Sequence, residues 1–295
     1  METSPITIPV FKIRASAIGT IMTSPERGKS VAERVADLTS DVGTRQEKIQ
    51  KLNPGTKAHD KALEMIERKK TALALLIPRL SEPRLSKTCI TFLRKWVDEH
   101  IYQRRVEFTS KQTDKGNIVE RDAINYAAIN IPEMGLVSKN QVRFKEHEYI
   151  TGEPDVMTAT TIYDTKCSWT HETFPLYSPE LEETNYEWQV LGYMEIAERK
   201  RGFVVFVLMS MPEEMIIREA RWKLPQDYSR EEFEAFAAQF RYDDLPAYLR
   251  LKTYEVSYDE ERIQAIKDRV LECRKYIDTV IMPEVEKNYH IYKEV

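Results

Sequence analysis

The stretch GEPDVMTATTIYDTK, from Gly152 to Lys166, decides the fold. A Pro–Asp pair opens it, and a short apolar run leads from there into Asp-Thr-Lys. Its alternating pattern indicates short β-strands. The segment VMTATT, which separates the Pro–Asp pair from the last strand, has the length of a hairpin, so we expect Asp155 to lie beside Asp164. The sequence thus predicts a β-hairpin that carries two carboxylates.

Strand geometry also brings Asp164 and Lys166 together. Side chains alternate between the two faces of a strand, so these two point the same way, roughly 6–7 Å apart, while the Thr165 carbonyl lies between them at the edge. Oxygens of Asp155, Asp164 and Thr165 would form a hard site that suits Mg²⁺, with Mn²⁺ able to substitute. The Lys166 ammonium could orient or deprotonate a water there. The alternative is a solvated charge pair that follows an ordinary turn.

The first half of the chain predicts helices on either side of this hairpin. Residues 30–77 indicate a charged helical hairpin that breaks at NPGT, and residues 86–108 indicate a further helix. We expect a loop at SKQTDKGN, with Asp114 or Asn117 opening the next helix. Two or three short strands follow within residues 140–169.

The second half continues the alternation of helices and strands. YEWQVLGYMEIAER predicts a helix, RGFVVFVLMS predicts a strand buried on both faces, and EEMIIREARWKL predicts a further strand. Helices are expected near 229–240 and 258–288. The central order of helix, strands, helix and central strand indicates an α/β or α+β fold with helical additions.

Composition bounds the class of protein. The 295 residues are 42% hydrophobic and 31% charged, which fits a single domain over residues 1–295 with an elaboration. The three scattered cysteines offer neither a disulfide framework nor zinc spacing, and they exclude a four-cysteine iron–sulfur cluster. The net charge of −4 neither indicates nor excludes nucleic-acid binding, which needs only a local basic groove. No apolar run of 18 residues and no secretory signal occur, so we expect no membrane partner and a cytoplasmic location.

The hairpin stretch resembles the PD-(D/E)XK nuclease superfamily. Its pattern is G-x-P-D, then a second acid nine positions on, then x-K, and here Asp164 stands where Glu is commoner. Downstream, Gln189 and Tyr193 are similar to the Q-x-x-x-Y motif of the RecB-like branch, which includes phage lambda-type and YqaJ-like recombination exonucleases. Upstream, Glu120 follows Gly116 at the spacing of that branch's first motif. The opening FKIRASAIGTIMT is similar to the start of phage recombination exonucleases.

The resemblance implies a restriction-endonuclease-like core, which is a small mixed sheet flanked by helices. Residues 30–85 would then be a helical elaboration and 229–295 a C-terminal helical region. Glu120 would be a third carboxylate at the metal. Gln189 and Tyr193 would contact the DNA backbone or steady the site, and Ser16 and Arg14 would contact a DNA phosphate. Ser16 has an alternative role as the cap of a short helix over residues 17–22.

The activity that the resemblance implies is a Mg²⁺-dependent exonuclease that degrades linear double-stranded DNA, 5′→3′, in phage or prophage recombination. Catalysis would fall to Glu120, Asp155, Asp164 and Lys166. The expected partners are duplex DNA ends, a single-strand annealing protein and further copies of the chain, as a trimer by resemblance, in the cytoplasm of a bacterial host. One alternative is an endonuclease or a CRISPR-adaptation-type nuclease of the same superfamily. Another is a DNA-binding or interaction protein that has the fold without the catalysis.

Overall fold

The computed structural model describes residues 7–25, 29–80, 82–106 and 110–293. Contacts divide the chain into two compact units, each described by itself below. The first unit consists of Met1–Met22 and Asp98–Val270, and the second of Thr23–Val97 and Leu271–Val295. Within the described ranges, no helix combines the length and the apolar character needed to cross a membrane.

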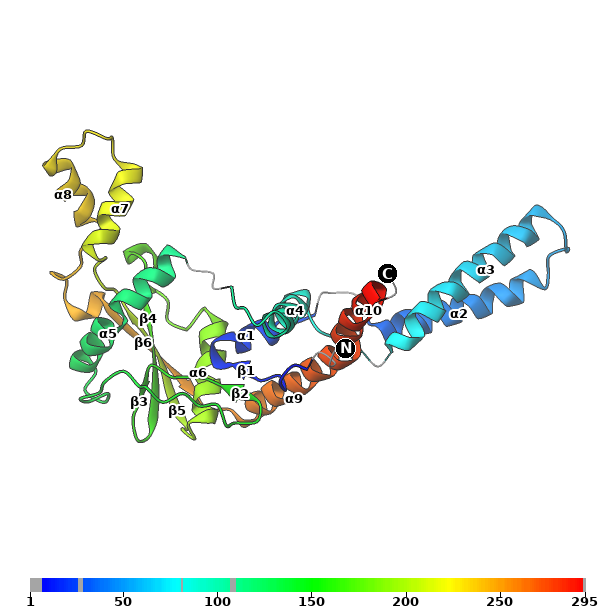
Figure 1. Ribbon diagram of the computed structural model, residues 1–295, viewed down its shortest axis with the longest axis horizontal. Helices are drawn as coiled ribbons and strands as arrows, with labels where there is room; N and C mark the ends of the chain where they lie inside the picture. The colour runs from blue at the N-terminus through cyan, green and yellow to red at the C-terminus, as the bar shows by residue number, and fades with distance from the viewer. Residues whose placement is uncertain (1–6, 26–28, 81, 107–109, 294–295) are drawn as a thin grey trace. The chain divides into compact units, whose positions relative to one another are not determined.

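A four-stranded mixed sheet forms the centre of the first unit (Figure 1). Its strand order is β3-β4-β5-β6, with β4 and β5 parallel and each outer strand antiparallel to its neighbour. The two parallel strands are joined by a helix, α6, as a parallel crossover requires. The elements are β3 (Val156–Met157), β4 (Thr161–Cys167), α6 (Thr184–Ile196), β5 (Arg201–Val207) and β6 (Leu251–Ser257).

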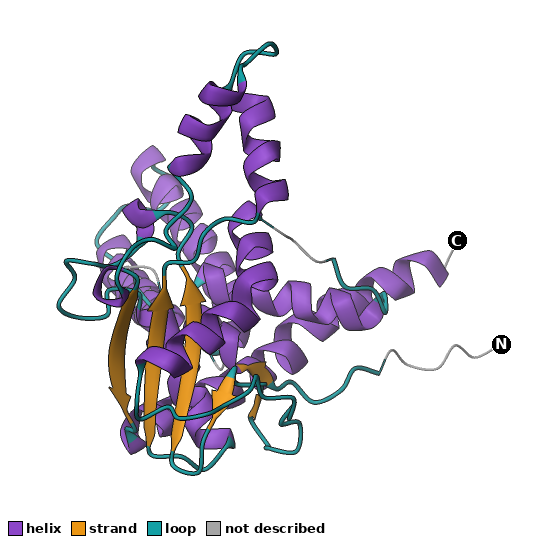
Figure 2. Ribbon diagram, turned by 90° about the vertical axis from the view of Figure 1, so that its left-hand side faces the viewer, coloured by secondary structure: helices purple, strands orange, loops and turns teal. Residues whose placement is uncertain are grey.

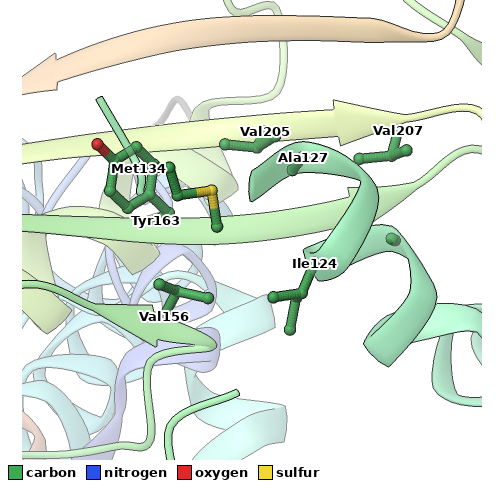
Figure 3. Packing of buried hydrophobic residues seen from close by; sticks show 8 residues of the cluster. Ile124, Ala127, Met134, Val156, Tyr163, Val205 and Val207 are labelled. Atoms are coloured by element: carbon green, nitrogen blue, oxygen red, sulfur yellow. The ribbon is translucent and has the colours of Figure 1, made fainter. Parts of the chain in front are cut away.

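Helices cover both faces of this sheet, which explains the continuous apolar run in β5. On one face, Ile124 and Ala127 of α5 (Lys111–Asn130) pack against Tyr163 of β4 and Val205 of β5 (Figure 3). On the other face lies α6, which packs so closely that a Cβ at Gly202 would meet Val190 at 2.4 Å. The predicted fold class and the order helix, strands, helix, central strand are confirmed.

A short parallel pair of strands brings the N-terminal segment to the hairpin. β1 (Ile13–Arg14) pairs with β2 (Ile150–Thr151), and the chain then enters a 3₁₀ turn over Ala15–Ala17 and the short helix α1 (Ile18–Ile21). The predicted cap by Ser16 is wrong, because Ser16 lies inside the 3₁₀ turn and neither turn nor helix has a side-chain cap.

The segment after β5 folds as a helical hairpin, so the strand predicted for EEMIIREARWKL is wrong. It forms α7 (Glu213–Lys223), and α8 (Arg230–Ala238) follows. Two acidic residues in its first turn and two basic residues in its last turn suit the helix dipole. Figure 2 shows this hairpin extending beyond one end of the sheet strands.

Two further boundaries differ from the sequence prediction. α5 begins at Lys111, inside the predicted loop, because the Ser110 hydroxyl caps it by accepting a hydrogen bond from the Thr113 amide at 3.2 Å. The strand β6 was not predicted, and it lies in the region 229–295 that we expected to be helical. Its burial alternates only weakly, as an edge strand with a solvated face allows.

The second unit contains the predicted helical hairpin of residues 30–77, which is confirmed. Ser30 and Glu33 form a capping box at the start of the first helix, and the Thr56 hydroxyl caps the second. Elsewhere in this unit the buried thiols of Cys89 and Cys273 lie 3.7 Å apart. The helices are α2 (Val31–Ile49), α3 (Lys57–Leu76), most of α4 (Lys87–Ile101), the end of α9 (Glu260–Tyr276), a π-turn (Ile277–Ile281) and α10 (Met282–Lys293).

Candidate active site

Asp164 and Lys166 lie on the face of β4 that is covered by α6. Their side chains form an ion pair, with Lys166 Nζ 2.8 Å from Asp164 Oδ2. Among the described residues, the buried Oδ2 has no polar partner besides this ammonium. The Lys166 ammonium also lies 4.8 Å from the centre of the Tyr186 ring. The alternation along the strand therefore predicted this pair correctly.

Gln189 of α6 joins the pair into one network. Its Nε2 donates hydrogen bonds to Asp164 Oδ1 at 3.1 Å and to the Tyr193 hydroxyl at 3.0 Å, while its Oε1 accepts one from Lys166 Nζ at 3.1 Å. Gln189 and Tyr193 are one helical turn apart and both are buried. A carboxylate acceptor on one side and an ammonium donor on the other fix the orientation of the amide.

Asp155 approaches the same strand from the edge. It directly precedes β3, and its Oδ2 accepts a hydrogen bond from the Thr165 amide at 2.7 Å. The amide and the carbonyl of one residue in a strand point to the same edge. The Thr165 carbonyl is therefore directed toward the edge where Asp155 lies, as the sequence predicts, while the Thr165 hydroxyl is buried and has no hydrogen-bond partner among the described residues.

Burial and charge repulsion dominate the electrostatics of these acids. Burial, reinforced by the negative charge of Asp164, raises the pKa of Asp155 to about 7. Burial also raises the pKa of Asp164, against the effect of the Lys166 ammonium. Burial alone would lower the pKa of Lys166, but the charge of Asp164 outweighs it and the pKa is raised. One lysine thus serves the buried Asp164 and the half-buried Asp155, which leaves the site short of positive charge.

Glu120 on α5 lies near this pair but is held by another residue. Its charge helps to raise the pKa of both Asp155 and Asp164, which shows that it is a neighbour of each. Its Oε2 accepts a hydrogen bond from Lys139, which sequence analysis missed. Among the described residues, no three His, Cys, Asp or Glu side chains are grouped closely enough to hold one metal ion. The structure therefore brings together Asp155, Asp164 and Lys166, with Glu120 beside them.

The N-terminal residues Arg14 and Ser16 line a separate small cavity. This cavity measures about 220 Å³ and is also lined by Arg143, Glu153 and Tyr193. Arg143 was not identified from the sequence, because nothing local distinguishes it from other surface arginines. Tyr193 links the cavity to Asp164 through the amide of Gln189.

A second lysine, Lys115, is fully buried beneath the end of β4. It projects from α5, and its Nζ donates hydrogen bonds to the carbonyls of Ser168 and Trp169, each at 2.8 Å. Burial lowers the pKa of Lys115 to about 8. These carbonyls follow Lys166 by two and three residues, so Lys115 fixes the turn that ends the strand. Sequence analysis missed this role, because a lysine in SKQTDKGN looks like a solvated residue.

Neither a family model nor a curated protein matches this sequence. Among solved structures, a phage-related exonuclease from Haemophilus somnus 129PT is similar over 94% of this chain and 97% of its own, at a TM-score of 0.61 and 22% identity. An alkaline exonuclease from Laribacter hongkongensis is similar over 70% of this chain and 88% of its own, at a TM-score of 0.49 and 12% identity. The chain therefore shares its fold with the phage-related exonuclease.

Proposed function

We propose that this protein is a metal-dependent exonuclease that hydrolyses phosphodiester bonds in linear double-stranded DNA. The observation that carries the proposal is the joint arrangement of Asp155, Asp164 and Lys166 at one edge of β4. A buried carboxyl, a half-buried one and a lysine at such an edge are poorly explained as a surface charge pair, since Asp164 is only 1% exposed. The fold shared with a phage-related exonuclease supports the same conclusion.

The residues at this edge fit a divalent cation. Asp164 Oδ2 is buried and has only the Lys166 ammonium as a polar partner among the described residues, and the Thr165 carbonyl is directed to the same edge as Asp155. We assign these three residues as the groups that would hold Mg²⁺, or Mn²⁺ in its place, with Glu120 as a neighbouring carboxylate. When bound, the ion would neutralise charge on the phosphate and lower the pKa of a bound water.

The remaining residues of the site position the reacting groups. The Lys166 ammonium orients the attacking water and faces the negative charge that builds up on the phosphate. Gln189 holds both Asp164 and Lys166, and Tyr193 holds Gln189, so the buried pair acts on the site more directly than on the DNA backbone. Arg14, Ser16 and Arg143 line the nearby cavity with donors that suit a DNA phosphate.

The finer assignment follows from the sequence resemblance. We propose 5′→3′ degradation during phage or prophage recombination, in the cytoplasm of a bacterial host, together with a single-strand annealing protein. A trimer of this chain is proposed on the same ground. These assignments concern the biological role of the activity, and they rest on the sequence resemblance and not on the chemistry of the site.

The proposal is tested by comparing linear duplex DNA with a closed circle in the presence of Mg²⁺. Degradation of the linear duplex alone is expected. Cleavage of the circle would instead identify an endonuclease of the same superfamily. A folded preparation that binds DNA and cuts neither substrate would show that the fold serves binding without catalysis.

The metal assignment has its own test, which does not depend on activity. Calorimetric titration with Mn²⁺ should show binding to the unaltered protein and strongly weakened binding to Asp155→Ala and Asp164→Ala. Thr165→Ala is the matched control, because the proposed ligand there is the backbone carbonyl, and its affinity should not change. Full stoichiometric binding in both aspartate variants would refute the ligand assignment.

A further inference from the structure

The exposed face of α7 combines an aromatic ring with two cationic side chains. Met215, Ile216, Glu219 and Ala220 form the buried face of this helix. Arg218, Arg221 and Trp222 lie away from that face, and their spacing of three and four residues places them together on the opposite side of its last turns. Trp222 is 81% exposed, which leaves the faces of its indole open to a partner.

We call the surface formed by Arg218, Arg221 and Trp222 the Trp222 surface. Ordinary structural roles explain only part of it. Cationic residues in the last turn of a helix interact favourably with its dipole, and that accounts for one basic residue or two. It does not account for an indole that is left in water, because a tryptophan gains most from burying its large ring. Neither Arg218 nor Arg221 forms an ion pair with a carboxylate of the described residues.

Three acidic residues of the hairpin are paired with other cationic side chains. Arg241 forms ion pairs with Glu213 at 3.0 Å and with Glu234 at 2.7 Å. Glu219, on the buried face of α7, is paired with Lys111. These three glutamates do not pair with Arg218 or Arg221, whose charges can interact with an anionic partner.

The α7–α8 hairpin that carries this surface is held together by aromatic, capping and apolar contacts. The Tyr228 ring stacks on Phe233, with the ring centres 6.0 Å apart, and Ser229 and Glu232 form a capping box at the start of α8. Between the two helices, Phe236, Phe240 and Met215 form a small apolar core.

The α7–α8 hairpin packs against the residues that follow β4. Trp169 packs against the apolar core of the hairpin, and its carbonyl is one of the two that Lys115 holds. Lys111, on the first turn of α5, pairs with Glu219 of α7. Through these contacts, the Trp222 surface is connected to β4, which carries Asp164 and Lys166. Figure 1 shows α5, α7 and β4.

We propose that the Trp222 surface binds single-stranded DNA, with the indole stacked on an unpaired base and the two guanidinium groups on neighbouring phosphates. An exposed aromatic ring among cationic side chains is the arrangement that holds single strands, since every base offers a face for stacking. In a duplex those faces are covered by neighbouring bases. The inference rests on the proposed function, because digestion of one strand of a duplex leaves its complement unpaired.

The test measures the affinity for a fluorescently labelled oligothymidylate by anisotropy, in the presence of a chelator so that the strand is not degraded. Trp222→Ala should weaken binding by about tenfold, and Trp222→Phe, which keeps an aromatic face, by no more than about threefold. Tyr177→Ala is the matched control, because Tyr177 is 93% exposed in a different segment, and it should bind as the unaltered protein does.

The two arginines are tested by salt dependence. For a single strand, the slope of log affinity against log salt becomes shallower by about 0.7 for every phosphate that the protein no longer neutralises, so Arg218→Ala/Arg221→Ala should reduce it by about 1.4. Far-UV circular dichroism confirms that the variants are folded, as expected for positions away from the buried face.

Three results would overturn the inference. They are unchanged single-strand affinity in Trp222→Ala, an unchanged salt slope in the double variant, or an equal reduction of affinity for blunt duplex DNA. Degradation of linear duplex by the unaltered protein, measured in the same preparation, separates the two proposals. If the unaltered protein degrades DNA and the variants bind normally, only the Trp222 surface is wrong, whereas a preparation that neither degrades nor binds DNA contradicts the proposed function as well.

Discussion

In α6 and β4, a few side chains hold one another through buried polar contacts, whereas in the α2–α3 hairpin most side chains face water. Of the 13 residues of α6, seven are buried, and two of those are the polar residues Gln189 and Tyr193. The 19 residues of α2 bury only Val42, and the 20 residues of α3 bury only Ile66 and Leu76. The hairpin also has capping residues and exposed ion pairs, such as that of Lys70 with Glu67 at 2.9 Å.

This difference teaches where the protein is sensitive to change. Buried polar groups lose their full solvation when a partner is removed, so each contact in the site has a large effect. Exposed ion pairs are screened and contribute little each. We therefore expect substitutions in the candidate active site to change cleavage or stability much more than substitutions in the α2–α3 hairpin. The following changes test this difference, from the largest expected effect to the smallest.

Lys166→Ala should have the largest effect on activity. It removes the ammonium that faces both carboxyls, and we expect cleavage of linear duplex to fall by about 10²–10³-fold. Binding of DNA should change little, because one lysine contributes few of the phosphate contacts. Single-turnover cleavage and anisotropy measure the two quantities separately. Cleavage near the unaltered rate would remove Lys166 from the mechanism.

Lys115→Met should have the largest effect on stability. Methionine has a similar volume but leaves the carbonyls of Ser168 and Trp169 without a donor in a buried place. The free energy of unfolding should fall by about 3 kcal/mol, measured by urea denaturation. Lys70→Met, which breaks an exposed ion pair with Glu67, is the matched control and should have a smaller effect. Equal decreases in the two variants would contradict the role given to Lys115.

The pH dependence of that decrease provides a second measurement. Because burial lowers the pKa of Lys115 to about 8, against 10.5 for an ordinary lysine, the unfolded chain binds the extra proton between these values. The stability that Lys115 contributes should therefore increase as the pH rises from 8 to 10.5. The neutral amine still has two N–H donors for the two carbonyls, so its hydrogen bonds survive. A difference between the two proteins that shrinks over this range would contradict the assignment.

Gln189→Leu should reduce cleavage by about 10- to 100-fold, because residues that orient catalytic groups typically have effects of this size. It removes three hydrogen bonds at once, including both that tie Asp164 and Lys166 to α6. Tyr193→Phe removes only the acceptor of the third bond, so its effect should be smaller. The ratio of the two rates, together with Mn²⁺ affinity, tests the network. A larger reduction in Tyr193→Phe would indicate that the phenol has a role of its own.

The sequence was sufficient to predict those parts of the site and of the fold that depend on local pattern. The two-residue period of a strand places Asp164 and Lys166 on one face, and the short hairpin places Asp155 beside them. The break at NPGT separates α2 from α3 in the same local way. The apolar run of β5 is recognisable because a strand covered on both faces has no polar alternation.

The parts that the sequence did not reveal depend on partners far along the chain. Lys115 finds its carbonyl partners 53 and 54 residues away, and Lys139 finds Glu120 19 residues away. The strand prediction for α7 failed because residues 215–217 form an apolar run that suits either structure. The charges at its two ends, Glu213 and Lys223 among them, were the signal that favoured a helix.

Ser30→Ala should have the smallest effect. It removes the hydroxyl that accepts a hydrogen bond from the Glu33 amide at 3.2 Å, so the start of α2 loses one cap and the free energy of unfolding should fall by about 1 kcal/mol. Cleavage of linear duplex should not change. Ser229→Ala is the matched control, because the capping box at α8 has the same 3.2 Å bond but lies on the hairpin that is tied to β4. If Ser30→Ala impaired cleavage, the cap of α2 would act on the active site, and the contrast between the site and the α2–α3 hairpin would not hold.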